Sequence, residues 1–212
     1  MTPPDFFTAF AQGLFMSASL IIAIGAQNTF VLRQGLRREH VPLVVGLCAV
    51  MDALLIAAGV SGVAAALGRH QGALDGLALG GAAFLVAFGV GALRRALAPP
   101  ALLASAHGAA QPARAVLGQA LAITLLNPHV YLDTVLLLGA AGAQHPAALQ
   151  PAFVLGGALA SAAWFMALGF GARLLAPVFA RPQSWRVLEA LVATTMFALA
   201  GMLAKTPLAR ML

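Results

Sequence analysis

The chain has 212 residues, of which 61% are hydrophobic and 8% are charged, and its formal net charge is +6. A soluble domain carries roughly 25% charged residues, so this composition excludes a water-soluble globular protein. It predicts an all-α integral membrane protein. The arginines occur in pairs and triplets between apolar segments, which is typical of topogenic charge and does not indicate a nucleic-acid partner.

Six apolar segments each approach the roughly 20 residues that a membrane span needs. They are Phe6–Leu32, Val41–Leu67, Leu74–Leu93, Ala115–Leu138, Ala148–Leu175 and Val187–Leu203. Within one membrane domain, residues 98–114 read as a flexible linker between two three-helix halves, 1–97 and 115–212. Because each half has three spans, the second half enters the bilayer from the opposite side, which predicts inverted repeats.

The arginine and lysine counts predict the orientation of these spans. The loops after the first, third and fifth spans carry nine such residues, and the opposite side carries three. The positive-inside rule therefore places both termini outside and the 98–114 linker in the cytoplasm.

Polar breaks interrupt the first and fourth spans at nearly corresponding points of the two halves. Hydrocarbon offers no water to free backbone groups, so a helix breaks there only under cover of protein or a wet cavity. Paired broken helices indicate a transporter's binding site near the midplane, with ordinary kinks as the alternative. We take Gly25 and Pro128 as the breaking residues. The amides in the breaks are candidate substrate contacts: Gln27, Asn28 and Asn127.

Two carboxylates, Asp52 and Asp133, lie inside apolar runs. An aspartate at a helix centre costs about 2.5–3.5 kcal/mol, so it normally faces a bundle interior or a wet cavity. With no basic residue expected inside a span, its counterpart is a bound cation, a proton or an arginine from a loop. For Asp52 the alternative is a structural salt bridge, for example to Arg33 or Arg69. His129 precedes Asp133 by four residues, a spacing that suits proton handling if the helix resumes between them.

These features together describe a site for a basic amino acid. The carboxylates suit its cationic side chain. Freed N–H groups at the start of a half-helix suit its α-carboxylate.

Other chemistry has little support in the sequence. The single cysteine, Cys48, excludes an intrachain disulfide and a cysteine-ligated cluster. The five histidines show no HExxH or His-x-x-x-His spacing, so we expect no metal and no cofactor. No Gly-x-Ser-x-Gly motif is present, so an enzyme is a weak alternative. A passive channel or a structural membrane protein is the other.

Three motifs of the chain resemble the LysE superfamily. Residues 25–35 (GAQNTFVLRQG) resemble its first-helix motif, and residues 47–52 (LCAVMD) also match. Residues 126–134 (LNPHVYLDT) are close to the signature of its lysine/arginine exporter branch. One departure is Ala26, where the family usually has proline.

This resemblance implies export of L-arginine or L-lysine across the bacterial inner membrane, driven by the membrane potential or a proton gradient. It also implies a small oligomer such as a homodimer. By motif match, Asp52 and Asp133 carry over as functional carboxylates, and Asn28 and Asn127 as break residues. Sister branches export threonine, homoserine or cysteine-related metabolites, and the choice of branch rests on residues 131–133.

Overall fold

The computed structural model describes residues 5–22, 25–63, 71–97, 111–125, 127, 130–179 and 181–211. These residues form helices and no strand, as the composition predicts for an all-helical membrane protein. The helices are α1 (Phe6–Ile21), α2 (Ala26–Arg37), α3 (Val41–Ala58), η1 (Gly59–Val63), α5 (Gln71–Leu97), α7 (Ala113–Leu125), η2 (Tyr131–Leu138), α9 (Gly139–Ala143), α10 (Gln150–Gly171), η3 (Ala172–Leu175), α11 (Ala176–Phe179) and α12 (Pro182–Met211).

Four described helical segments are long and apolar enough to cross a membrane. They are Val41–Gly62, Ala78–Leu97, Gln150–Leu175 and Gln183–Met202. The helices α1 and α2 add a fifth if the pair, bent by 80°, is one span. Two shorter apolar helices, Ala113–Leu125 and Tyr131–Ala143, flank the second break. The chain is therefore a multi-pass membrane protein.

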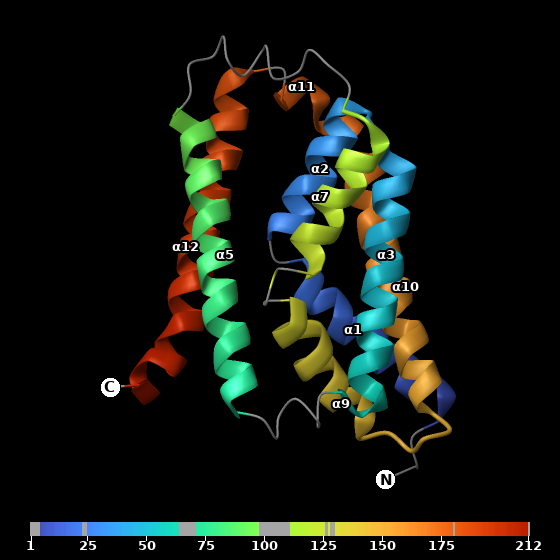
Figure 1. Ribbon diagram of the computed structural model, residues 1–212. Coiled ribbons are helices and arrows are strands. Elements are labelled where there is room, and N and C mark those ends of the chain that lie inside the picture. Colours follow the sequence, from blue (N-terminus) through green and yellow to red (C-terminus); the bar gives the residue numbers. More distant parts are fainter. Residues whose placement is uncertain are drawn as a thin grey trace.

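The helices fall into a pair and a bundle (Figure 1). The two longest helices, α5 and α12, pack along each other on one side, while α1, α2, α3, α7 and α10 form the bundle beside them. The start of α1 and the end of α12 lie at one end of the molecule, and α11 lies at the other with the ends of α2 and α5 (Figure 1).

The start of α1 is capped by Asp5, whose carboxylate accepts a hydrogen bond from the Thr8 backbone N–H at 2.7 Å. This bond favours the charged carboxylate and lowers the pKa of Asp5 below its ordinary value.

Contact between α1 and α10 depends on small residues. A Cβ added to Gly13 would lie 2.0 Å from the Phe153 carbonyl oxygen, and one added to Gly156 would lie 2.0 Å from the Phe10 carbonyl oxygen. Only glycine permits so close an approach of two helices. In lipid, where apolar surface gives no drive for helices to associate, such contacts hold a bundle together.

Candidate functional site

A cavity of about 160 Å³ lies where the two breaks meet α3, α10 and α12. Its polar lining consists of Ser17, Gln27, Asn28, Asp52, Asn127, Asp133, Thr134, Ser161 and Thr195. Gly25 also lines it. The structure thus gathers around one cavity all the site residues predicted from sequence that it describes. His129 and Pro128 lie outside the described residues.

The first break is bridged by Asn28. The Asn28 Nδ2 donates to the Ile21 carbonyl at 2.7 Å, at the end of α1, and its Oδ1 accepts from the Trp164 indole N–H at 3.2 Å. The first bond gives the Ile21 carbonyl a partner, which the break would otherwise leave without one in hydrocarbon. Asn28 therefore holds the break in shape, and its amide is less available to a substrate than the sequence suggested.

Helix α2 starts at this break with its N-terminus on the cavity. Gly25 is the N-cap in extended conformation, and no side chain caps the first N–H groups. Gln27, the second residue of α2, is 9% exposed, and its side-chain amide faces Asp52 and Cys48 of α3. This end of the cavity therefore presents donors and a positive helix dipole.

The second break follows the same scheme. Helix α7 ends at Leu125, and its carbonyl accepts a hydrogen bond from the Tyr131 hydroxyl at 2.9 Å. Asn127 lies between the half-helices, 6% exposed, and its carbonyl accepts from the Val130 N–H at 3.2 Å. In both halves a side chain from the second half-helix thus satisfies the last carbonyl of the first.

Asp133 projects from a π-helix. The helix resumes as η2, an eight-residue π segment, and Asp133 lies in its first turn, half-buried. π-helices are rare and frequently occur at functional sites. The expectation that residues 129 and 133 share a face assumed α-helical winding, which the structure does not have at Asp133.

Asp52 lies on α3, 7% exposed, and accepts a hydrogen bond from the Ser161 hydroxyl at 2.9 Å. The proposed alternative, a salt bridge to Arg33, is wrong. Arg33 instead pairs with Glu189 of α12. Arg69, the other suggested partner, lies outside the described residues.

Glu189 has partners that the sequence did not predict. In the structure it is 2% exposed and forms ion pairs with Arg33 of α2 and with Arg95 of α5, the latter at 3.0 Å. This triad links the α5–α12 pair to α2. It was missed because α12 begins at Pro182, earlier than the apolar run suggested.

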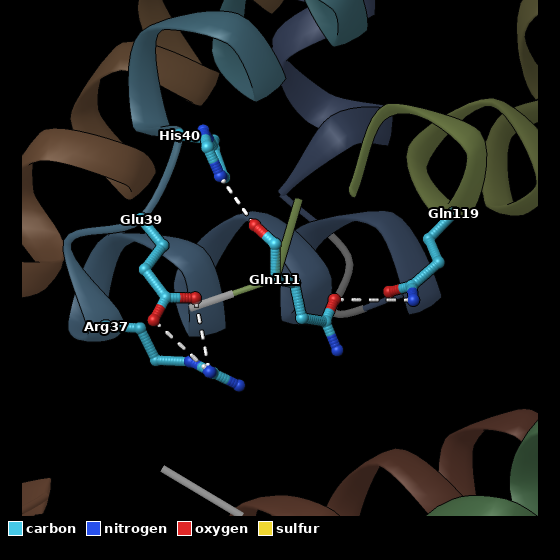
Figure 2. Close-up of polar contacts among 5 residues, drawn as sticks. All are labelled: Arg37, Glu39, His40, Gln111 and Gln119. Carbon is cyan, nitrogen blue, oxygen red and sulfur yellow. Dashed lines mark hydrogen bonds and ion pairs between the residues drawn. The ribbon is translucent and has the colours of Figure 1, made fainter. Parts of the chain in front are cut away.

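The turn between α2 and α3 forms a second polar network (Figure 2). The Arg37 guanidinium pairs with the Glu39 carboxylate at 3.2 Å, and the His40 Nε2 donates to the Gln111 carbonyl at 2.8 Å. A Gln119 side-chain amide also reaches the Gln111 side chain at 3.4 Å. This network ties the turn to the segment that leads into α7, and none of its members lines the cavity.

Sequence reasoning also missed the hydroxyl side chains in the cavity wall, among them Ser17 and Ser161. Their helices gave a signal. Ala9, Gly13 and Ser17 repeat at four-residue intervals on α1 and are all buried, which marks a small-residue face ending at Ser17.

The cavity carries two carboxylates, and no arginine, lysine or histidine among the described residues lines it. No three histidine, cysteine, aspartate or glutamate side chains in that part of the chain are arranged to hold a metal ion. The arrangement suits an organic cation with an anionic end, held between carboxylates and a helix N-terminus.

Comparison with known proteins agrees with this chemistry. Residues 18–206 match the family described as LysE type translocator. A putative amino-acid transporter of Mycobacterium tuberculosis is 48% identical over 86% of this chain and 90% of its own. The arginine exporter protein ArgO of Photorhabdus laumondii is 39% identical, with 93% and 96% covered. That of Pectobacterium carotovorum is 40% identical, with 94% and 98% covered.

No solved structure matches the chain. The family match and the relatives each extend over most of its length. The chain belongs to the LysE-type translocator family of amino-acid transporters.

Proposed function

We propose that this protein is a secondary transporter that exports arginine or lysine from the cytoplasm across the bacterial inner membrane. The observation that carries the proposal is the convergence of Asp52 and Asp133, one from each half of the chain, on one cavity. The full-length similarity to proteins named arginine exporters supports it.

In this proposal two kinds of group in the cavity wall recognise the two charged groups of the substrate. Asp52 and Asp133 pair with the guanidinium or ammonium group, since a carboxylate in hydrocarbon is stabilised by a cation. The uncapped N-terminus of α2 receives the α-carboxylate. The Gln27 amide faces Asp52 and orients that carboxylate. Asn28 and Asn127 hold the breaks open, and His129 belongs to the second break.

Energy coupling follows from the charge of the substrate. Moving one positive charge outward against an inside-negative potential costs about 2.3 kcal/mol per 100 mV. Export against a gradient therefore needs a counter-movement. Protons entering from outside can occupy the same carboxylates after the substrate leaves, so we propose exchange of the amino acid for protons.

We also propose that the halves are inverted repeats with six spans, counting α1–α2 and α7–α9 as one broken span each. Two close approaches support this arrangement. A Cβ on Gly35 of α2 would lie 2.2 Å from the Gly169 carbonyl oxygen of α10, and one on Gly139 of α9 would lie 2.6 Å from Gly59, where α3 ends. In each case the half-helix after a break crosses a long span of the other half. Helix α2 crosses α10, and α9 crosses the end of α3.

The test is counterflow in proteoliposomes that contain the purified protein. We expect labelled arginine to accumulate when the vesicles are preloaded with arginine or lysine, and not when they are preloaded with citrulline, a neutral analogue of similar shape. Asp133→Asn should lose this activity at least tenfold while the protein folds as before, because the amide keeps the shape of the side chain and removes only its charge.

Asp75→Asn is the matched control, because Asp75 is a carboxylate of α5 outside the cavity lining. Citrulline or threonine counterflow equal to that of arginine would indicate that the protein exports neutral amino acids. Flux without counterflow would indicate a passive channel. Normal arginine counterflow by folded Asp133→Asn would contradict the proposed site.

A further inference from the structure

A chain of hydroxyl groups ends on Asp52. The Ser161 hydroxyl of α10 donates to Asp52 Oδ2 at 2.9 Å, and the Ser17 hydroxyl of α1 lies 3.5 Å from that of Ser161. All three residues are buried, with exposed fractions of 1%, 7% and 2% for Ser161, Asp52 and Ser17. The three also line the cavity.

The packing of α1 on α10 explains why these hydroxyls meet. Ser17 follows Gly13 by one turn, and Ser161 follows Gly157 by one turn, so each serine continues the small-residue face of its helix. Gly13 and Gly156 bring the two backbones together. The hydroxyls therefore face each other where that contact reaches the cavity.

The direction of the hydrogen bonds follows from proton counting. A serine hydroxyl has one hydrogen, and a carboxylate can only accept. Ser161 donates its one hydrogen to Asp52, so it can only accept in its contact with Ser17. Both hydroxyl dipoles then point toward the carboxylate, and a hydrogen bond of this kind favours its charged form.

We propose that Ser161, supported by Ser17, is a positioning residue of the transport site. It donates to Oδ2 of Asp52, favours the charged form of the carboxylate, and orients it toward the cationic group of the substrate. This inference rests on the proposed function, because it concerns how Asp52 meets a basic amino acid.

Few titratable groups face Asp52 from the surrounding helices. Cys48 lies one turn earlier on α3, and Asp133 of η2 lines the same cavity. The described parts of α1, α2, α10 and α12 present hydroxyl and amide groups to the cavity and no ionisable side chain. A change in the charge of Asp52 is therefore not masked by a basic neighbour.

The experiment measures arginine binding as the arginine-induced rise in melting temperature of the purified protein between pH 4.5 and 8. In the parent, the rise should disappear as the pH falls and the carboxylates become protonated. Ser161→Ala removes a hydrogen-bond donor from the charged form of Asp52, so the carboxylate is protonated more readily and arginine binding is lost earlier on acidification. We call the pH range over which binding is lost on acidification the acid limb. We expect the pH at which this loss begins to rise by about one unit, which is about a tenfold loss of affinity within that range.

Ser17→Ala should move the limb in the same direction by less, because it acts through Ser161. Ser19→Ala is the control on the same helix, since the Ser19 hydroxyl bonds the Met16 carbonyl and does not line the cavity. It should leave the limb unchanged.

The inference is overturned if Ser161→Ala, folded and with its own melting transition, binds arginine with the parent's pH profile. It is also overturned if binding falls equally at every pH, because that is the signature of a packing defect. Absence of arginine binding by the parent at every pH would instead contradict the proposed function.

Discussion

At the scale of single residues, the breaks show how polar side chains make a broken helix tolerable in lipid. Asn28 serves two groups at once, the Ile21 carbonyl and the Trp164 indole N–H. An amide carries its donor and its acceptor on two separate atoms, so one side chain can bridge two groups that lie apart.

Replacing Asn28 with Ala should therefore be more destabilising than replacing Trp164 with Phe. The first change leaves a carbonyl and an N–H without these partners, at about 1–3 kcal/mol for each buried group, whereas the second removes one bond together with its donor. Thermal melting in detergent measures the difference. Equal melting temperatures for the two variants would show that the amide does not bridge the break.

Much of the candidate site was predictable at this scale because amide and carboxylate residues are easily recognised within an apolar stretch of sequence. Asp52 and Asn127 stand out since hydrocarbon penalises them so strongly. Ser17 and Ser161 were not predicted, because a serine in a membrane helix can bond the carbonyl of its own preceding turn, as Ser19 does with Met16. Only the packing of a second helix shows which serine contacts a group of the site, as Ser161 does with Asp52.

At the scale of elements, two kinds of contact hold the helices together: glycine crossings and the buried triad. Long apolar runs made most helices predictable, but their ends were not. Helix α12 extends well before the expected Val187, and this extension buries Glu189 between Arg33 and Arg95. Tertiary partners thus stabilise a charge that sequence alone assigns to a helix end.

Glu189→Gln should destabilise the protein markedly, by about 3–5 kcal/mol, because it leaves the guanidinium of Arg33 without its countercharge. The arginine next to Arg95, Arg94, is exposed and supplies the control: Arg94→Gln should have little effect. Folded yield and melting temperature in detergent check both. A Glu189→Gln protein as stable as Arg94→Gln would mean that the triad contributes nothing to the attachment of α5 and α12.

The glycine crossing of α1 and α10 gives a sharper contrast. Gly156→Ala places a Cβ 2.0 Å from the Phe10 carbonyl oxygen, so the helices must separate. Gly118→Ala on α7 meets nothing within 4 Å and should be neutral or slightly stabilising, since alanine is the better helix former. We expect a lower melting temperature and a lower folded yield for Gly156→Ala alone; similar behaviour of both variants would contradict the close approach.

At the scale of the whole molecule, the arginine-rich turns and ends predict the orientation in the membrane. Gln144 follows α9 and Gln183 lies at the start of α12, and both are exposed. In a Cys48→Ala background, a cysteine at Gln144 should react with an impermeant maleimide in intact cells, and one at Gln183 only after the cells are permeabilised. The reverse pattern would invert the orientation.

The winding of η2 has a consequence for reading related sequences. The Gly139–Gly59 crossing fixes one end of this segment, and the break at Asn127 fixes the other. Between these anchors, the number of residues decides where Asp133 points. Deleting one exposed residue such as Leu137 removes no polar group, yet it would change the direction of the carboxylate relative to the crossing, because each residue contributes to the turn of the helix. A relative one residue shorter here must carry its carboxylate at another position to reach the same cavity.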